Sequence, residues 1–297
     1  MKLLLTGASG FIGKEIMRKL IGTMEIVTLG RKTNAHICCN LGNDIPAIPF
    51  VDIVIHAAGK AHTVPGNQTE KEDFFKSNVE GTQNLLKGLE NIKTLKKFIF
   101  LSSVSVYGLT AGTLINEQAP LLATDSYGRS KIVAEQLIEN WCVAKNIDYY
   151  ILRLPLVAGK NAPGNLGAMV KGITTGKYFS IGKARAKKSI VLAGDIGALL
   201  VSLNGKSGIY NLTDGQHPSF GELEIYIAQF FKKKIPFTIS NNFAQALAFA
   251  GDFLGRRAPI NSSKLRKITS TLTFDDSKAT QFLQWKPTSV LKGWKPA

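Results

Sequence analysis

The run Lys2-Leu3-Leu4-Leu5-Thr6-Gly7-Ala8-Ser9-Gly10-Phe11-Ile12-Gly13 opens the chain and is its most informative stretch. The short apolar run predicts a buried parallel strand, and the helical spacing of Ile12, Ile16 and Leu20 predicts a helix directly after it. Glycines separate the two elements. A strand, a glycine-rich turn and a helix in this order form a dinucleotide-binding crossover, in which the pyrophosphate rests on the helix N-terminus.

The glycines of such a turn have separate physical roles, because one makes the turn tight, one lets the backbone approach a phosphate, and one lets the helix pack closely on the strand. The spacing here, G-x-x-G-x-x-G, differs from the commoner G-x-G-x-x-G. The residues that we expect to bind the cofactor at this turn are Gly7, Ser9, Gly10, Phe11, Ile12 and Gly13. An ordinary strand-to-helix turn without a ligand is the alternative at this point.

Strand-like and helix-like patterns alternate up to about residue 157. Predicted strands cover 25–29, 51–57, 97–102 and 149–157, and predicted helices cover 73–89 and 125–145. This alternation indicates a parallel sheet with helices on both faces. After residue 159 the helical patterns are shorter and strand-like pieces are isolated.

We therefore predict an α/β protein with two parts. Residues 1–159 form a Rossmann-type domain, a doubly wound parallel sheet that parts of residues 186–214 complete. Residues 160–297 form a smaller, mixed α/β lobe that binds the substrate.

The net charge of +16 bears on the partners of this 297-residue chain. Basic residues gather at 183–188, 232–234, 256–257 and 264–267. No aromatic-interleaved basic strand or recognition helix accompanies them, so we expect acidic small molecules or an anionic membrane surface and not nucleic acid. A plain solvated basic face is the alternative for most of these lysines.

Cysteines indicate the cellular compartment. Cys38, Cys39 and Cys142 are odd in number and lack metal-type spacing, which is typical of a reducing compartment. No apolar stretch approaches the ~18 residues that span a bilayer. We expect a cytoplasmic protein without a metal site.

The segments Ser102-Ser103-Val104-Ser105 and Tyr127-Gly128-Arg129-Ser130-Lys131 carry the candidate chemistry. Tyr127 and Lys131 share one face of a predicted helix, so the ammonium can lie near the phenol oxygen. A nearby cation lowers the tyrosine pKa from ~10, which makes Tyr127 a candidate general acid and base. Ser103 ends a predicted parallel strand, where binding residues of doubly wound sheets lie. Without that setting, the tyrosine and lysine are an ordinary surface pair.

The end of the second predicted strand bears on the form of the cofactor. NAD sites place a carboxylate there for the ribose 2′-hydroxyl, whereas an arginine accommodates the 2′-phosphate of NADP. This chain has Leu29-Gly30-Arg31-Lys32, with no carboxylate and two cations. We therefore predict NADP, with NAD the less favoured form, and Arg31 and Lys32 facing the phosphate. The alternative is that both cations face only water.

Taken together, these motifs resemble the short-chain dehydrogenases/reductases in their extended form, of the sugar-nucleotide epimerase/dehydratase type. The resemblance covers almost the whole chain. Its further matching pieces are His56-Ala57-Ala58-Gly59, Asn78-Val79-Glu80-Gly81-Thr82, Leu152-Arg153-Leu154-Pro155-Leu156-Val157, Asn165-Leu166, Gly208-Ile209-Tyr210-Asn211-Leu212 and Leu283-Gln284-Trp285-Lys286-Pro287.

The resemblance implies roles for individual residues. The implied catalytic triad is Ser103, Tyr127 and Lys131. The implied cofactor contacts beyond the glycine turn and Arg31 and Lys32 are Ala57, Ala58, Gly59, Asn78, Tyr127, Lys131 and Pro155, the last near the nicotinamide. The implied substrate contacts are Ser103, Ser105, Tyr127, Asn165 and Lys188. Asn165 would meet the substrate diphosphate, and Lys188 stands where many relatives have an arginine, although lysine lacks the bidentate fork. The resemblance also implies a homodimer formed through the helices at 73–89 and 125–145.

The same resemblance leaves the reaction open. Related 4,6-dehydratases have an Asp-Glu pair after the catalytic serine or threonine, where this chain has Val104 and Ser105, so we do not expect dehydration. The cysteine and the later histidine of GDP-fucose-type epimerase/reductases are missing from the matching places. A 4-ketoreductase and a 4-epimerase remain, since both need only the triad and a cofactor.

We expect an NADP-dependent oxidoreductase that reduces the C4 ketone of an NDP-linked 4-keto-6-deoxy sugar, with UDP as the nucleotide, for surface-polysaccharide synthesis. The sequence as a whole resembles those of the UDP-N-acetyl-6-deoxyhexosulose 4-reductases. The first alternative is an NDP-sugar 4-epimerase with tightly bound NAD. The second is a catalytically inactive NADP-binding sensor or scaffold.

One more stretch, Phe243 to Leu254, predicts a helix with a broadly apolar face. Phe243, Leu247, Ala250 and Leu254 recur at helical spacing, and Arg256-Arg257 follow. We expect this helix to pack in the core of the substrate lobe. The alternative is an interfacial helix that associates weakly with an anionic membrane surface.

Overall fold

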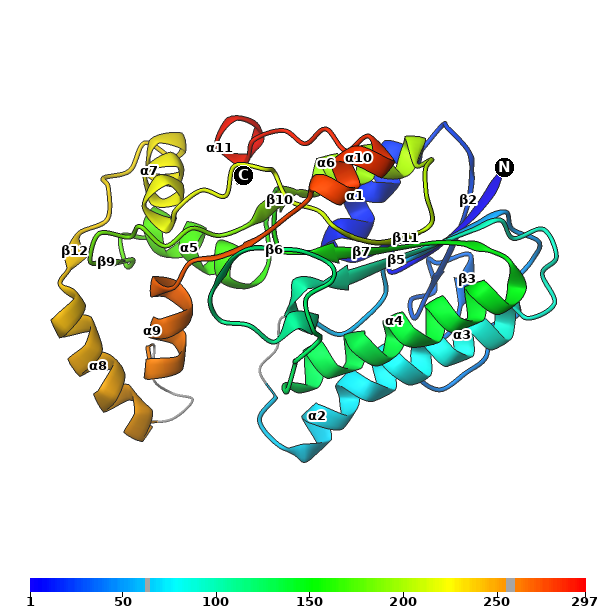
Figure 1. Ribbon diagram of the computed structural model, residues 1–297, viewed down its shortest axis with the longest axis horizontal. Helices are drawn as coiled ribbons and strands as arrows, with labels where there is room; N and C mark the ends of the chain where they lie inside the picture. The colour runs from blue at the N-terminus through cyan, green and yellow to red at the C-terminus, as the bar shows by residue number, and fades with distance from the viewer. Residues whose placement is uncertain (62–64, 255–259) are drawn as a thin grey trace.

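A parallel sheet with helices on both faces forms the larger part of the computed structural model, which describes residues 1–61, 65–254 and 260–297 and only the backbone of Leu254 (Figure 1). Its seven strands lie in the order β11-β7-β5-β4-β1-β2-β3. Their bounds are β1 Lys2–Thr6, β2 Glu25–Gly30, β3 Ile37–Cys38, β4 Ile53–His56, β5 Lys97–Ser103, β7 Asp148–Leu154 and β11 Gly208–Asn211. The predicted α/β, doubly wound fold is therefore confirmed.

All strands are parallel, but the order in which they are added to the sheet reverses at β1. Strands β2 and β3 follow on one side of β1, whereas β4, β5, β7 and β11 follow on the other. Open α/β sheets bind their ligands outside the carboxyl ends of the strands at such a switch point. The loops after β1, β4 and β5 meet there.

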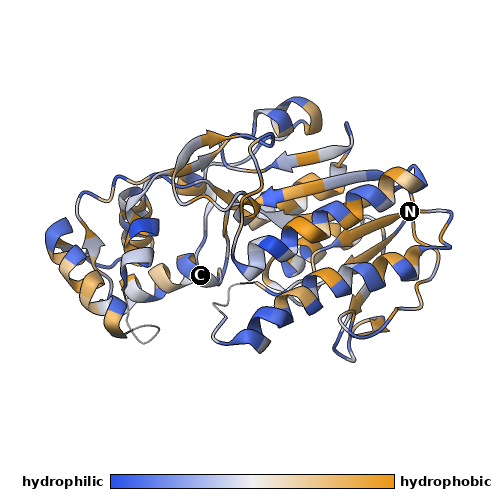
Figure 2. Cartoon of the chain, turned by 60° about the horizontal axis from the view of Figure 1, so that its bottom comes forward, coloured by the Kyte–Doolittle hydropathy of each residue, from blue (hydrophilic) through white to orange (hydrophobic). Residues whose placement is uncertain are grey.

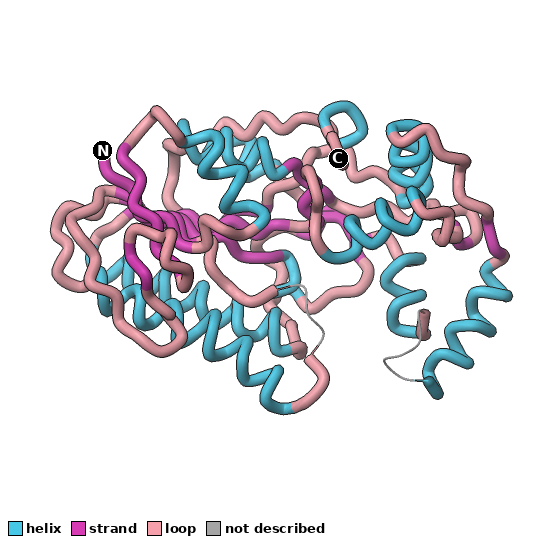
Figure 3. Tube along the Cα trace, turned by 180° about the vertical axis from the view of Figure 1, so that it is seen from behind, coloured by secondary structure: helices cyan, strands magenta, loops and turns pink. Residues whose placement is uncertain are grey.

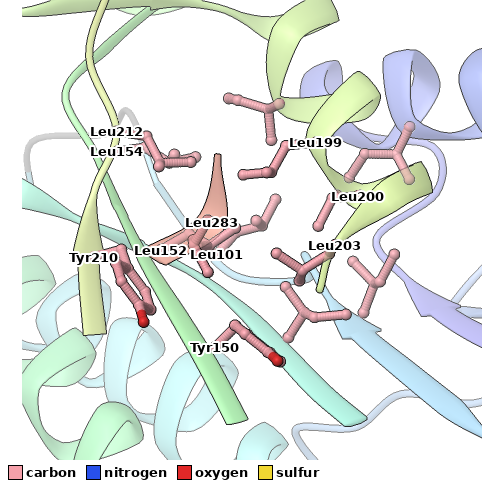
Figure 4. Close-up of a cluster of buried hydrophobic side chains, with 14 of the residues drawn as sticks. Leu101, Tyr150, Leu152, Leu154, Leu199, Leu200, Leu203, Tyr210, Leu212 and Leu283 are labelled. Carbon is pink, nitrogen blue, oxygen red and sulfur yellow. The ribbon is translucent and has the colours of Figure 1, made fainter. Parts of the chain in front are cut away.

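Apolar side chains of β1 point to both faces of the sheet, and helices cover each face. Leu3 and Leu5 point into one apolar core and Leu4 points into the other. The helices over the first core are α1 Phe11–Leu20, α6 Ala193–Ser202 and α10 Ser277–Leu283, and those over the second are α3 Gly81–Leu89 and α4 Ser126–Lys145. Figure 4 shows part of the first core, in which leucines from α6 pack against strand residues such as Leu101 and Leu152.

Helix α4 agrees with the prediction at both ends. The side chain of Asp125 caps its N-terminus by accepting a hydrogen bond from Gly128 N at 3.0 Å, and the helix ends at Asn146 in a left-handed conformation. Because the cap fixes the first turn, it also fixes the direction of Tyr127 within that turn.

Two predicted elements are divided in the structure. The helix predicted at 73–89 consists of α2 Gln68–Phe75, a π-helical segment Lys76–Glu80 and α3. The strand predicted at 149–157 ends at Leu154, because Pro155 has no N–H to give to a neighbouring strand. Its continuation, β8 Leu156–Ala158, pairs instead with β10 Ile190–Leu192.

The remaining elements lie mostly at the other end of the molecule, where Figure 3 shows helices and loops with short strands. They are η2 Val104–Tyr107, β6 Gly112–Ile115, α5 Gly164–Thr174, β9 Ser180–Ile181, α7 Phe220–Phe230, β12 Thr238–Ile239, α8 Asn241–Leu254, α9 Ser262–Thr269, β13 Leu272–Phe274 and α11 Val290–Gly293. Among the described residues, no helix combines the length and apolar character that crossing a membrane requires. The division at residues 159 and 160 stays a prediction.

Gly13 tests the close approach of α1 to β1. A Cβ on Gly13 would lie 2.1 Å from the carbonyl oxygen of Gly7 and 2.9 Å from Cα of Ala8. Gly13→Ala should therefore lower the free energy of unfolding by about 1–3 kcal/mol, as overpacking does. The matched control is Gly194→Ala in the first turn of α6, where a Cβ would meet nothing within 4 Å and should stabilise the helix by up to about 1 kcal/mol. Equal urea midpoints for the wild type and Gly13→Ala would contradict this packing.

Candidate functional site

The loop after β1 has the shape of a cradle for an anionic ligand. Gly7 has a φ of +74°, and its carbonyl oxygen accepts a hydrogen bond from Gly10 N at 2.9 Å. A Cβ on Gly7 would lie 2.6 Å from Ala58 N, so only glycine fits between this turn and the loop after β4. Gly10 begins α1 without a side-chain cap, which leaves the first N–H groups of the helix for a ligand. These donors and this space fit a dinucleotide diphosphate.

A buried histidine connects β1, β4 and α3. His56 Nδ1 lies 2.7 Å from Thr6 Oγ1, and His56 Nε2 lies 3.1 Å from Thr82 Oγ1. Since the Thr82 hydroxyl donates to Asn78 O at 2.6 Å, it accepts from Nε2–H of His56. Burial and the charge of Lys131 lower the pKa of His56 to about 3. His56 is therefore neutral and has a structural role beneath the cofactor loop.

Asn78 ties three parts of the site together from within the π-helical segment. Its Oδ1 accepts a hydrogen bond from Lys60 N at 2.7 Å, and its Nδ2 donates to Ser130 Oγ at 2.9 Å. Ser130 in turn donates to the carbonyl oxygen of Tyr127 at 2.8 Å. A Cβ on Gly59 would lie 2.9 Å from Asn78 Oδ1. The fold thus brings the loop after β4, Asn78 and the start of α4 into contact, and π-helical segments often mark such sites.

Ser103 and Tyr127, predicted to act together, lie close enough in the structure for Ser103 to lower the pKa of the Tyr127 phenol. Ser103 ends β5, and its Oγ accepts from Ser105 N at 3.2 Å, which caps the short helix η2. Tyr127 lies in the first turn of α4, with its ring centroid 6.0 Å from that of Phe74 in α2. The Oγ atoms of Ser103 and Ser105 are 3.1 Å apart. Two serine hydroxyls and a phenol therefore gather at the carboxyl end of β5.

Lys131 lies one turn after Tyr127 but is oriented toward the strand beneath. Its Nζ donates to Leu101 O at 2.9 Å and lies 4.3 Å from the centroid of the Phe100 ring. Burial lowers the pKa of Lys131 to about 8, and the charge of Glu135 acts in the opposite direction. The lysine is close to the loop after β4, because a Cβ on Gly59 in that loop would lie 3.5 Å from its Nζ.

The pKa of Tyr127 differs from the sequence-based expectation. Burial raises it above the ordinary value, the hydrogen bond with Ser103 lowers it, and the charge of Asp125 raises it. The expectation that Lys131 lowers this pKa is wrong for this structure, because the lysine ammonium is directed to the carbonyl oxygen of Leu101. Tyr127 is therefore a protonated phenol at neutral pH.

The other residues predicted to contact the cofactor or the substrate lie outside the group of Ser103, Tyr127 and Lys131. Arg31 and Lys32 are exposed directly after β2. Pro155 lies between β7 and β8, and Asn165 is exposed in the first turn of α5. Lys188 is almost fully buried, with Nζ donating to Ser270 O at 2.7 Å. The roles of all these residues stay predictions.

A buried network behind the triad was not predicted. Glu135 and Arg153 form an ion pair at 2.7 Å, with side chains only 3% and 2% exposed. Ser102 donates to Glu135, and Arg153 Nη1 donates to the Tyr107 hydroxyl at 3.0 Å. Two signals could have revealed it: a charged residue in the apolar strand 149–157, and a carboxylate four residues after Lys131 on the same helix face.

Among the described residues there is no group of histidine, cysteine, aspartate and glutamate that could hold a metal ion. The three cysteines are free thiols, and burial raises the pKa of Cys142 to about 12.

Removal of the Glu135 charge tests the network. Glu135→Gln leaves Arg153 buried without a counter-ion, so the free energy of unfolding should fall by about 3–5 kcal/mol. The matched control is Glu25→Gln, which breaks the exposed pair with Lys2 and should change stability by less than about 1 kcal/mol. Urea denaturation of both variants measures the difference, and equal small losses would show that the pair contributes no more than a surface pair.

Comparisons with known proteins agree with this geometry. The NAD dependent epimerase/dehydratase family matches residues 3–207. The N-acetyl-α-D-glucosaminyl-diphospho-ditrans,octacis-undecaprenol 4-epimerase of Escherichia coli O157:H7 is 27% identical over 93% of this chain and 87% of that protein. The UDP-glucose 4-epimerase of Vibrio cholerae is 24% identical over 98% and 92%.

The structure is similar to that of a UDP-glucose 4-epimerase from Thermotoga maritima, solved with UDP-glucose. The TM-score is 0.76 at 19% identity, with 99% of this chain and 96% of that chain covered. The names of these relatives are those of sugar 4-epimerases and not of 4-reductases. The chain therefore belongs to the NAD dependent epimerase/dehydratase family and is an NAD(P)-dependent enzyme of the short-chain dehydrogenase/reductase type.

Proposed function

We propose that this protein is a 4-epimerase of a diphosphate-linked sugar, with a UDP-sugar as the first candidate substrate. The observation that carries the proposal is that Ser103 at the end of β5 and Tyr127 in the first turn of α4 come together near the glycine cradle. The two positions after Ser103 are Val104 and Ser105, so neither carries the carboxylate that dehydration would require there. One proton-transferring phenol is what an epimerase at C4 needs, and the family membership and the names of the relatives support the same reaction.

The residues that would hold the dinucleotide are those of the glycine turn, Arg31, Lys32, Ala57, Ala58, Gly59, Asn78, Lys131 and Pro155. When bound, a nicotinamide dinucleotide supplies reversible hydride transfer at C4 of the sugar. The protein then has to move one proton, bind one oxygen and hold the diphosphate of the substrate.

Tyr127 performs the proton transfer in this proposal. It takes the proton of the 4-hydroxyl as the C4–H bond breaks, which leaves a ketone at C4, and returns it to O4 when the C–H bond forms on the opposite face. Ser103 donates a hydrogen bond to O4 while that oxygen carries negative charge. The first step requires the phenolate form of Tyr127, which the neighbouring Ser103 favours, because its interaction with the phenol lowers the tyrosine pKa. His56 takes no part, since it is buried and neutral.

The carrier of the sugar is the second question. The E. coli relative is named for a sugar linked to undecaprenol through a diphosphate, and the Vibrio relative for UDP-glucose. The diphosphate is common to both carriers. We therefore propose a sugar diphosphate as the substrate class, to be contacted by Asn165 as the family resemblance implies.

A 4-ketoreductase is the second candidate, and two observations favour it. Tyr127 is protonated at neutral pH and can give its proton to a C4 ketone. Arg31 and Lys32, without a carboxylate at the end of β2, suit the 2′-phosphate of NADP, and a reductase must exchange that cofactor.

Incubation with UDP-glucose or UDP-N-acetylglucosamine, without added cofactor, separates the two candidates. An epimerase that retains its dinucleotide converts part of the sugar to the 4-epimer, which NMR detects, and the denatured protein releases the dinucleotide. A reductase forms no epimer and oxidises NADPH in proportion to an added 4-keto-6-deoxy sugar nucleotide. That second result would overturn the epimerase proposal.

Tyr127→Phe tests the proton transfer. The variant keeps the packing of the ring but has no proton to exchange, so kcat should fall more than tenfold, equivalent to about 1.4 kcal/mol or more of barrier. Cofactor binding and unfolding should change little. Tyr149→Phe is the matched control. The Tyr149 hydroxyl donates to Glu139 at 2.6 Å, farther along α4 from Tyr127, so this variant should leave kcat unchanged. A Tyr127→Phe variant with more than a tenth of the wild-type kcat would exclude Tyr127 as the acid and base.

Arg31→Asp tests the proposed cofactor contact. It replaces a cation with a carboxylate suited to a ribose 2′-hydroxyl, and hydrogen bonds to charged groups contribute ~1.5–3 kcal/mol each. The ratio of NADP to NAD affinity should therefore fall tenfold or more in a fluorescence titration. Arg266→Asp, an exposed change on α9, should leave the ratio unaltered. If both variants behave as wild type, Arg31 faces only solvent.

A further inference from the structure

Helix α8 has its large apolar side chains on the outside. Among the α8 residues whose side chains are described, only small ones are turned inward, with Ala244 and Ala248 packing against Leu265 of α9. Figure 1 shows α8 and α9 side by side at the end of the molecule that is farthest from the parallel sheet. The helix therefore packs against its neighbour α9 through its small residues, and its large apolar face is not part of the core.

The exposed face of α8 is strongly apolar. Its exposed fractions are 55% for Phe243, 42% for Leu247, 64% for Phe249 and 78% for Phe253. The rings of Phe249 and Phe253 are 5.2 Å apart between centroids, so they form one continuous patch. In Figure 2, hydrophobic residues run along this helix at the left edge of the molecule. Contiguous exposed apolar surface of this kind marks an interaction site.

More apolar side chains are exposed directly before α8. Phe179 and Phe237 precede the paired strands β9 and β12, where Ser180 N donates to Phe237 O at 3.0 Å, so the two phenylalanines are neighbours. Both are exposed, as is Ile235. Further exposed apolar side chains therefore lie at the start of β9 and β12, and β12 leads directly into α8.

Charge is distributed in a way that suits an anionic partner. Residues 160–297 contain 20 lysines and arginines against seven aspartates and glutamates, so they account for +13 of the net charge of +16. Lys177 and Lys232 to Lys234 are exposed close in sequence to the exposed phenylalanines and Ile235, and α9 exposes Lys264, Arg266 and Lys267. Asp252, the acidic residue of α8, accepts a hydrogen bond from Ser262 N at 3.0 Å.

We propose that the exposed face of α8, together with Phe179, Ile235 and Phe237, docks on the surface of a membrane that contains anionic lipids. Aromatic side chains enter the boundary between headgroups and acyl chains, and the surrounding lysines and arginines contact lipid phosphates. A second copy of the chain fits this face less well, because two surfaces of the same high positive charge would meet. Arg256 and Arg257, which the sequence analysis included in this surface, lie outside the described residues. The proposal does not depend on the reaction that the protein catalyses.

Sedimentation with lipid vesicles tests the docking. The full chain should pellet with vesicles of phosphatidylcholine and phosphatidylglycerol at low salt. Pelleting should decrease about tenfold or more with phosphatidylcholine alone or at high salt, since the attraction to anionic lipid is screened. Absence of pelleting with anionic vesicles at low salt would overturn the proposal.

Two variants locate the contact. Phe249→Ser with Phe253→Ser should reduce pelleting about tenfold or more, whereas the matched control Phe50→Ser should leave it unchanged. Phe50 is 73% exposed but lies in the loop before β4. Equal pelleting of the two proteins would overturn the proposed surface.

A direct readout is Phe253→Trp. Its fluorescence should shift to the blue and be quenched by brominated lipid when anionic vesicles are added, and an unshifted spectrum would contradict insertion. Size-exclusion chromatography gives the remaining outcome. A wild-type dimer that Phe249→Ser with Phe253→Ser converts to monomer, without vesicle binding, would assign the face to a second copy and overturn the membrane proposal.

Discussion

The buried ion pair of Glu135 and Arg153 is the interaction on which the candidate site depends most. Burying two opposite charges is favourable only when the geometry of the ion pair is good and the remaining hydrogen-bonding groups have partners. Here Ser102, Arg153 and Tyr107 complete the network, and Tyr107 donates to Asn211 Oδ1 at 2.8 Å. The pair therefore fixes α4 against β5, β7 and β11 at once, which sets the position of Tyr127 relative to Ser103.

The same pair also acts on the chemistry. Glu135 lies one turn after Lys131, and its charge opposes the effect of burial on the pKa of that lysine. Without the carboxylate, the lysine would lose its proton at a lower pH. A single buried network thus holds the helix that carries the tyrosine and maintains the charge of the lysine beside it. Because these two effects share one residue, structural and catalytic consequences of change at Glu135 are coupled.

The molecule separates its functions along its length. The glycine cradle, Ser103 and Tyr127 gather at the switch point of the sheet, where strand ends and a helix N-terminus converge. The exposed phenylalanines of α8, together with the lysines and arginine that α9 exposes, lie at the opposite end.

Local sequence determined much of this protein by itself. Alternating apolar strands and helices predicted the doubly wound sheet, and the glycine spacing predicted the cradle, because both depend on residues close together in the chain. The spacing of Tyr127 and Lys131 and the serine at the end of β5 predicted the candidate triad. The helical stretch predicted at 125–145 corresponds to α4 Ser126–Lys145, whose N-cap is Asp125, since helical periodicity and capping are local properties.

Only the tertiary structure decided features that depend on burial and on contacts distant in sequence. It joined Glu135 to Arg153 and turned the Lys131 ammonium to Leu101. It also buried Tyr127, and this burial raises the tyrosine pKa where a decrease was expected. It also set the orientation of α8, in which Ala248 faces inward and Phe253 faces solvent. A helical pattern shows that one face is apolar, but the partner that covers that face, or its absence, is set by the packing of the whole chain.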